Sequence, residues 1–324
     1  MKRPFFWKIN GIISNLLIPI SIIYTSISKF SYFIRRKYIS DIPIISVGSP
    51  IIGGGGKTPV VIAIINFLIT KNKKACVLTK GYKGSIRHPT IINNMHEVKE
   101  VGDEPLLISK IIDTFVSKKR REGLEKINSY KYDLIVLDDG YRDVSILNKI
   151  NILVIDGNTK LYNNFLFPSG EMLGSISTNI KNSDAIVQLN QDKIPIKIQH
   201  AIRDSRKPNT PTNINYTFRH SNIKNRIAFC GIGVPEKFYS TLENKEIKFI
   251  KKITFNNHYY YSQNDVDYLL KISKKFEKYT LVTTAKDFVR FDDHNDPNKE
   301  LRKVLDVLDM NIKFDNEDIL LELI

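Results

Sequence analysis

The residues of this chain with the clearest chemical potential form a glycine-rich stretch. It contains Gly53, Gly54, Gly55, Gly56, Lys57, Thr58 and Pro59. The backbone N–H groups of such a loop bind phosphate oxygens, and a helix that follows it adds the positive end of its dipole. In this arrangement the lysine reaches the β- and γ-phosphates of a nucleotide, and the threonine hydroxyl ligates Mg²⁺. The stretch therefore predicts a phosphate-binding loop in which Lys57 and Thr58 carry the reactive groups.

The sequence on either side of the glycines favours this interpretation. A β-branched run at 44–47 precedes them and an apolar periodic segment at 60–68 follows, which predicts a strand, a loop and a helix in that order. The general pattern has a glycine six residues before the lysine, where this chain has Ile51. A flexible glycine turn that happens to precede Lys-Thr is the alternative, and the flanking elements argue against it.

A second group of candidate residues ends the apolar run at 134–137. Asp138 and Asp139 follow that run directly, and Gly140 comes next. A carboxylate at the end of a strand beside the phosphate loop holds Mg²⁺, directly or through water, opposite the loop threonine. The pattern therefore predicts Thr58, Asp138 and Asp139 as metal ligands.

Further candidates have two interpretations each on sequence alone. Asp103 lies with Glu104 at a loop-to-helix junction, before a helix predicted over 106–115, so the two carboxylates are either helix caps or catalytic acids. His258 lies in the polar and aromatic loop 256–262 and is either structural or catalytic. Three basic residues are candidates for phosphate contacts or parts of a solvated face: Lys80, Arg120 and Arg121.

The predicted strands and helices alternate along the chain, which indicates an α/β fold with a mostly parallel, doubly wound sheet. Strands are predicted at 75–78, 150–156, 183–189, 227–230, 247–255 and 280–284, with helices up to 242 and up to 272, and a helical or mixed segment from 299. Polar and proline residues accumulate between 190 and 225. We therefore predict an N-terminal segment at 1–40, a nucleotide-binding domain at 41–205 and a smaller α/β domain at 206–324.

Composition limits the classes of partner. The 324 residues are 42% hydrophobic and 26% charged, which is ordinary for a globular protein, but the net charge is +15. Such an excess suggests a polyanionic partner: nucleic acid, an anionic membrane or a phosphorylated substrate. The two cysteines, Cys76 and Cys230, lie in apolar surroundings without a metal-binding pattern. We expect both to be reduced core residues of a cytoplasmic protein.

The first 40 residues favour the membrane among these partners. They contain no acidic residue, and basic residues flank an apolar run at 12–24 that is interrupted by Ser14, Asn15, Pro19 and Ser21. The run is too short and too interrupted for a spanning helix. We expect an amphipathic or broken helix in the cytoplasmic leaflet, with Phe5, Phe6 and Trp7 at the interface. A core helix packed under the sheet is the alternative.

Taken in order, these motifs resemble the tetraacyldisaccharide 4′-kinase family of lipid A biosynthesis over nearly the whole chain. The stretches that carry the resemblance are Val47-Gly48, the loop from Gly53 to Pro59, Gly81-Tyr82-Lys83-Gly84, Val101-Gly102-Asp103-Glu104-Pro105, Leu137-Asp138-Asp139-Gly140, Leu166-Phe167-Pro168-Ser169-Gly170, Gly231-Ile232-Gly233-Val234-Pro235-Glu236, His258 and Thr284-Ala285-Lys286-Asp287. The family loop also lacks the first glycine of the general pattern, in keeping with Ile51.

The resemblance implies an ATP- and Mg²⁺-dependent kinase at the cytoplasmic face of the inner membrane. Its acceptor would be the 4′-hydroxyl of a membrane-embedded, tetraacylated glucosamine disaccharide 1-phosphate. The implied fold is a P-loop domain with an N-terminal membrane-contacting helix and a smaller domain that closes over the nucleotide. We expect an anionic membrane surface as partner, and no nucleic acid or obligate protein partner.

The same resemblance suggests catalytic roles. We expect Lys57 and Asp139 to act at the transferred phosphoryl group, and Asp103 to accept the proton of the sugar hydroxyl with His258 orienting or tuning it. The chain departs from the family pattern at three places near these residues. Arg142 and Asp143 stand where the family has Gln-His, Asn257 and Tyr259 flank His258 in place of Asp and His, and Glu171 to Gly174 replace Pro-Leu-Arg-Glu.

Three other functions remain open at this point. A P-loop GTPase or ATPase that loads a metal or cofactor is one, although the chain has no guanine-specifying Asn-Lys-x-Asp. A nucleic-acid-binding ATPase is another, but the basic residues gather around an apolar N-terminal run rather than among stacking aromatics. The third is a catalytically decayed membrane protein that still binds nucleotide, which the departures suggest.

Overall fold

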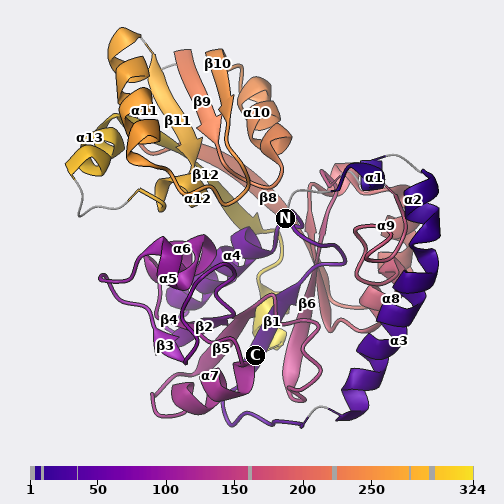
Figure 1. The fold of residues 1–324 in the computed structure, drawn as a ribbon. Coiled ribbons are helices and arrows are strands. Elements are labelled where there is room, and N and C mark those ends of the chain that lie inside the picture. Colours follow the sequence, from indigo (N-terminus) through magenta and orange to yellow (C-terminus); the bar gives the residue numbers. More distant parts are fainter. Residues whose placement is uncertain are drawn as a thin grey trace.

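The computed structural model describes residues 4–8, 11–34, 36–159, 163–220, 225–276, 279–291 and 296–323. Within them one sheet runs through the molecule in the strand order β10-β9-β11-β12-β8-β7-β6-β1-β5-β2-β4-β3 (Figure 1). The strands are β1 (Ile44–Gly48), β2 (Ala75–Thr79), β3 (Thr90–Ile91), β4 (Thr114–Val116), β5 (Leu134–Asp138), β6 (Lys149–Asp156), β7 (Ala185–Leu189), β8 (Asn209–Phe218), β9 (Asn225–Cys230), β10 (Lys248–Thr254), β11 (Thr280–Thr284) and β12 (Leu305–Phe314). Only the β8–β12 and β3–β4 pairs of this sheet are antiparallel, so the predicted mostly parallel α/β fold is confirmed.

Helices cover both faces of the sheet. They are α1 (Phe5–Lys8), α2 (Ile12–Leu16), α3 (Ile18–Ile34), α4 (Lys57–Thr70), α5 (Val98–Val101), α6 (Asp103–Ser109), α7 (Arg120–Ile127), α8 (Ile176–Lys181), α9 (Ile196–Asp204), α10 (Pro235–Asn244), α11 (Gln263–Lys275), α12 (Ala285–Phe288), α13 (Asp296–Val304) and α14 (Asp318–Glu322), with a 3₁₀ turn at Gln191–Lys193. Neighbouring residues of β5 show the two faces, since Val136 packs in the cluster around α4 while Ile135 packs with Leu124 of α7. Alternate side chains of a strand point to opposite faces, so α4 and α7 lie on opposite sides of the sheet.

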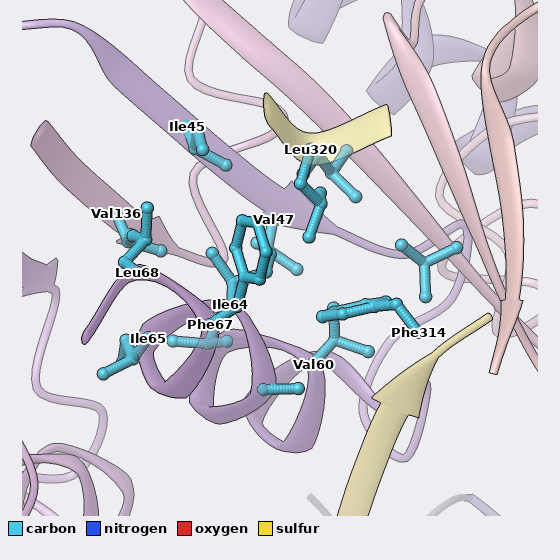
Figure 2. Close-up of a cluster of buried hydrophobic side chains, with 14 of the residues drawn as sticks. Ile45, Val47, Val60, Ile64, Ile65, Phe67, Leu68, Val136, Phe314 and Leu320 are labelled. Atoms are coloured by element: carbon cyan, nitrogen blue, oxygen red, sulfur yellow. The ribbon is translucent and has the colours of Figure 1, made fainter. Parts of the chain in front are cut away.

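The largest hydrophobic cluster surrounds α4. Val60, Ile64, Phe67 and Leu68 of that helix pack against Ile45 and Val47 of β1 and Val136 of β5 (Figure 2). Helix α4 is apolar on nearly all sides because the sheet covers one face and later segments cover the other. This burial fixes the start of α4, and with it Lys57, relative to the end of β1.

The molecule has two lobes, joined through β8 and β12 (Figure 1). The start of β8 pairs in parallel with β7, and its remainder pairs antiparallel with β12. One detail of the predicted boundary is wrong. Phe314 and Leu320, which we placed in the smaller domain, pack in the α4 cluster of the nucleotide-binding part (Figure 2). The chain end returns to the first lobe because β12 runs back across the junction.

Two element predictions also need correction. The helix expected over 106–115 ends at Ser109, and Thr114, Phe115 and Val116 form the buried strand β4 beside β2. β-Branched and aromatic residues favour that pleated, buried position. The segment from 299 contains the ten-residue strand β12, in which the first four residues are buried and apolar and polar residues alternate from Leu308 to Phe314.

Helix α3 runs along the outer edge of the first lobe, as the indigo helix at the right of Figure 1. It exposes a series of large apolar side chains, so it is not a core helix: Ile20, Ile22, Ile23, Ile27, Phe30 and Ile34. Its inner side is attached to the loop after β6, where the Ser21 hydroxyl donates to the Leu166 carbonyl at 2.9 Å. None of the helices among the described residues is long and apolar enough to cross a membrane.

Trp7 is not at the surface, contrary to our expectation. Its side chain is 2% exposed, and the indole N–H donates to the Pro168 carbonyl at 2.9 Å. The Ser169 hydroxyl in turn donates to the Ser14 carbonyl at 2.5 Å. A buried indole needs such a partner. Trp7 therefore anchors the N-terminal helices to the loop at 166–170 instead of contacting a membrane.

Candidate active site

The glycine loop connects the end of β1 to the start of α4, as predicted. Gly53, Gly54 and Gly56 have φ values of 66°, 68° and 75°, a region that other residues rarely adopt. Ile51 is 3% exposed and bridges to Met172, so its side chain belongs to the fold where the general pattern has glycine. Glycines therefore occupy 53–56 because the backbone conformation of the loop requires them. The loop and the first residues of α4 line one cleft.

That cleft has a volume of about 2250 Å³ and lies between the two lobes. The first lobe contributes the loop 53–59 with Asp138 and Asp139, and the second contributes Lys237, His258 and Lys286. The predicted phosphate-loop and carboxylate residues are therefore brought together on one side of a single cavity.

Lys57 and Asp139 form an ion pair across the loop. The Lys57 Nζ atom lies 3.1 Å from Asp139 Oδ1. Burial favours the neutral acid, but the charge and hydrogen bond of Lys57 outweigh it, so the pKa of Asp139 lies below its ordinary value. Asp139 also has φ of 55°, a strained value for a residue with a side chain.

Asp138 and Thr58 fit a magnesium ion. Both are nearly fully buried, and Asp138 Oδ1 has no hydrogen-bond partner within the described part of the chain. Burial, followed by the charges of Glu104 and Asp139, raises the pKa of Asp138 to about 7. No three His, Cys, Asp or Glu side chains gather as a metal site among the residues described. A P-loop site does not need three, because water and phosphate oxygens complete the shell of Mg²⁺.

Asp103 and His258 meet across the two lobes although 155 positions separate them. His258 Nδ1 lies 2.9 Å from Asp103 Oδ2 and 3.1 Å from Oδ1. Oδ2 also accepts from Arg290 Nη2 at 2.5 Å, and Oδ1 accepts from the Glu104 N–H at 2.9 Å. Both oxygens of this buried carboxylate are therefore engaged, whereas the imidazole of His258 lines the large cleft.

The surroundings keep Asp103 ionised. Burial alone would raise the pKa of Asp103, but the hydrogen bond from His258 and the charge of Arg290 outweigh it and lower the pKa well below its ordinary value. Arg290 is itself fixed by Asp287, whose Oδ1 lies 2.6 Å from Arg290 Nη1. Asp287 belongs to the Thr284–Asp287 motif. The motif therefore holds Arg290 in position to donate to Asp103 of the predicted catalytic pair.

Other contacts between the lobes were not predicted. Lys286 forms an ion pair with Glu104, next to Asp103 in the chain. Lys237 pairs with Asp156 at 2.7 Å and donates to the Gly54 carbonyl of the phosphate loop at 3.0 Å. Lys286 lies in the Thr284–Asp287 motif and Lys237 directly follows the Gly231–Glu236 motif. These positions were the only indication in the sequence that the two lysines contribute to the site. Their partners depend on how the lobes meet.

The three basic candidates lie in different surroundings. Arg121 forms an exposed pair with Glu125 at 2.7 Å. Arg120 is buried, and its guanidinium contacts Asp143 and two backbone carbonyls. Lys80 is exposed at the wall of the cleft. Lys80 therefore lies where a phosphate ligand was expected.

The departures from the family pattern are also accommodated by contacts. Arg142 donates to Asn179 Oδ1 at 2.8 Å, close to Gly174, and Asp143 pairs with Arg120. The Asn257 carbonyl accepts from Lys83 Nζ at 3.3 Å. The hydroxyl of Tyr259 donates to Asp265 at 3.2 Å, away from Asp103.

Comparisons with known proteins agree on one family. The family model LpxK, tetraacyldisaccharide-1-P 4′-kinase, matches residues 13–324. A tetraacyldisaccharide 4′-kinase of Rickettsia typhi is 33% identical over 98% of this chain and 96% of its own length. One of Rhizobium etli is 28% identical over 97% and 91%. The crystal structure of an "apo" form LpxK from Aquifex aeolicus in complex with ATP superposes with a TM-score of 0.77 at 23% identity, over 96% of this chain and 98% of that one.

Proposed function

Because the chain belongs to the tetraacyldisaccharide 4′-kinase family, we propose that it transfers the γ-phosphoryl group of ATP to the 4′-hydroxyl of a tetraacylated glucosamine disaccharide 1-phosphate. The product is a lipid IVA-type precursor of lipid A. One observation carries the proposal: the phosphate loop with Asp138 and Asp139, and the Asp103–His258 pair, lie at the same cleft between the lobes. The first set suits a nucleotide, and the second suits a hydroxyl that must lose its proton.

The nucleotide would lie on the backbone N–H groups of residues 53–56, with Lys57 at the β- and γ-phosphates. Thr58, Asp138 and Asp139 would hold Mg²⁺, which would neutralise negative charge on the phosphates during the transfer. The unpartnered Asp138 Oδ1 supports this assignment. Lys57 would exchange part of its contact with Asp139 for the transferred phosphoryl group.

In the transfer, the sugar oxygen forms a bond to the γ-phosphorus while the bond from that phosphorus to the β,γ-bridging oxygen breaks and ADP leaves. The hydroxyl proton passes to the Asp103–His258 pair. The sequence suggested Asp103 as the direct acceptor, but both of its oxygens are engaged and its pKa is low. We therefore assign the contact with the hydroxyl to the His258 imidazole, which Asp103 orients through Nδ1 and stabilises once it is charged.

The acceptor is a membrane lipid, so the protein must work at a surface. The apolar series on α3 and the net charge of +15 suit a peripheral or monotopic position on the anionic cytoplasmic face of the inner membrane. We also propose that the smaller lobe closes over the nucleotide. It was predicted as residues 206–324, but the chain returns to the first lobe at Phe314. Its contacts from Lys237 and Lys286 reach the first lobe at the cleft.

The proposal is tested by incubating the protein in detergent with γ-labelled ATP, Mg²⁺ and the tetraacylated disaccharide 1-phosphate. We expect label on the lipid, lost in Lys57→Ala and retained in Lys73→Ala, a control at an exposed lysine just after α4. Binding of ATP without any transfer to this lipid would refute the kinase assignment. That result would favour the alternative of a decayed nucleotide-binding membrane protein.

A further inference from the structure

Two basic side chains hold four successive carbonyls of the loop that carries Asp138 and Asp139. Arg120 Nη2 donates to the carbonyls of Asp138 at 3.0 Å and Asp139 at 2.7 Å. Lys149 Nζ donates to those of Gly140 at 3.0 Å and Tyr141 at 2.8 Å. Arg120 begins α7 and Lys149 begins β6, so the loop is held from two different elements.

These contacts are built rather than incidental. The Arg120 side chain is 3% exposed, and its counter-ion Asp143, 3.3 Å from Nη1, is 7% exposed. Asp143 is held by the Ser145 hydroxyl at 2.5 Å, and Lys149 also donates to Asn151 Oδ1 at 3.0 Å. Burying a guanidinium is costly unless it is hydrogen-bonded. Nη1 and Nη2 of Arg120 are both engaged, whereas Nε has no partner among the described residues.

The loop has a conformation that needs outside support. Asp139 has a φ of 55°, in the left-handed region that residues with a side chain adopt less readily than glycine. Its carboxylate neighbours that of Asp138, and the two charges repel each other. Asp139 nevertheless pairs with Lys57, and both carboxylates line the same cleft as Thr58. Contacts with all four carbonyls hold the backbone of the loop in this conformation.

We propose that Arg120 and Lys149 are positioning residues that clamp the loop 138–141 by its carbonyls and so align Asp138 and Asp139 for the metal–nucleotide complex, with Asp143 as the counter-ion that keeps Arg120 in place. The inference rests on the proposed function, because it assumes that those carboxylates hold a metal. It also explains what Asp143 does at a position where the family pattern has histidine.

The test measures metal binding and needs no lipid acceptor. Affinity for the β,γ-imido analogue of ATP is measured with Mn²⁺ and with excess EDTA. The ratio of the two affinities reports how much the metal strengthens binding of the analogue. The variants are Lys149→Met, Lys149→Arg and Asp143→Asn. Lys119→Met is the matched control, because Lys119 adjoins Arg120 but its side chain is 77% exposed and pairs with Glu122.

We expect Lys149→Met to lower the gain in analogue affinity that Mn²⁺ provides by about 10- to 100-fold, because this is the usual effect of losing a group that orients metal ligands. Affinity in EDTA should stay near that of the unmodified protein. Lys149→Arg should recover most of the loss, Asp143→Asn should show a smaller loss, and Lys119→Met none. In an Asp139→Ala background, Lys149→Met should have little further effect, since the side chain that it aligns is gone.

If the clamp is merely structural, the results differ. Lys149→Met then lowers thermal stability without changing the ratio of the affinity with Mn²⁺ to the affinity with EDTA, or it lowers that ratio by the same factor in the Asp139→Ala background. Either outcome overturns the proposal. Should Lys149→Met fail to fold, the ratio in Lys149→Arg and Asp143→Asn decides instead, with unchanged binding in Asp143→Asn counting against the clamp. Absence of lipid phosphorylation alongside the expected Mn²⁺ ratios would refute the kinase proposal and leave the clamp standing.

Discussion

Removal of the His258 imidazole should abolish most of the phosphoryl transfer while leaving nucleotide binding intact. In His258→Ala the carboxylate of Asp103 keeps its contacts with Arg290 and the Glu104 N–H, so it stays ionised and buried. The sugar hydroxyl then faces no group that can take its proton. Neither Lys57 nor Thr58 contacts His258 directly, so the phosphate loop should be unaffected.

The size of the effect follows from what is lost. A positioned proton-transfer group contributes about 10²–10⁴-fold to the rate, which corresponds to roughly 3–5 kcal/mol of the barrier. Asp103→Asn keeps a hydrogen-bonding group at 2.9 Å from Nδ1 but removes the charge, so we expect a loss within the same range. Because both residues serve one proton transfer, the double variant should be about as slow as the slower single variant.

The assay is label transfer to the lipid at saturating Mg²⁺, with kcat/KM followed from pH 5 to 8. Asp103 stays ionised over this range because its pKa lies below the ordinary value, and bound Mg²⁺ keeps Asp138 ionised. If the imidazole accepts the proton, His258→Ala should lose most of kcat/KM across this pH range. His200→Ala, an exposed control on α9, should match the unmodified protein.

Two results would refute this reasoning. Near-normal turnover in His258→Ala removes the imidazole from the reaction. Losses that multiply in the double variant show that Asp103 and His258 act independently. In the first case, a large loss in Asp103→Asn would restore Asp103 as the direct acceptor.

Two further predictions concern the membrane and the fold. Ile23→Glu with Ile27→Glu should lower partitioning onto anionic vesicles by about tenfold or more, since a buried isoleucine contributes about 1.5 kcal/mol or more; Ile196→Glu, equally exposed on α9, is the control, and unchanged flotation would remove α3 from the membrane contact. Arg226→Leu should lower the free energy of unfolding by about 3–5 kcal/mol, because it strands Asp306 in a fully buried pair with an N–O distance of 2.9 Å. The exposed pair Arg219–Asp309 supplies the comparison, and in urea unfolding Arg219→Leu should cost about 1 kcal/mol or less; equal costs would contradict the burial argument.

The elements with strong local patterns could be predicted from the sequence. The strand before the glycines, the glycine loop and α4 follow one another within a short stretch, and their residue types depend on local backbone conformation and on burial. The buried strand ending in Asp138 is of the same kind. Strand β12 was missed although apolar and polar residues alternate from Leu308 to Phe314, because the helix over Asp296–Val304 precedes it directly and its first four residues are all buried.

The candidate site divides in the same way. Lys57, Thr58, Asp138 and Asp139 could be identified because each ends a strand or begins a helix with a recognisable pattern. Asp103 and His258 were paired only through the family resemblance, since nothing in the local sequence of either indicates the other. Trp7 was misplaced because an aromatic residue near a basic end suits an interface and a buried anchor equally well.

By itself the amino-acid sequence determined the phosphate loop, the carboxylates at the end of β5 and the alternation of strands and helices, because these depend on neighbours along the chain. The tertiary structure alone decided that Arg290 keeps Asp103 ionised, that Lys237 and Lys286 reach across the cleft, and that Arg120 and Lys149 hold one loop from two elements. Those roles depend on which charges meet in a buried space. That meeting is set by the packing of segments far apart in the chain, where the same arginine or lysine would otherwise be an ordinary solvated side chain.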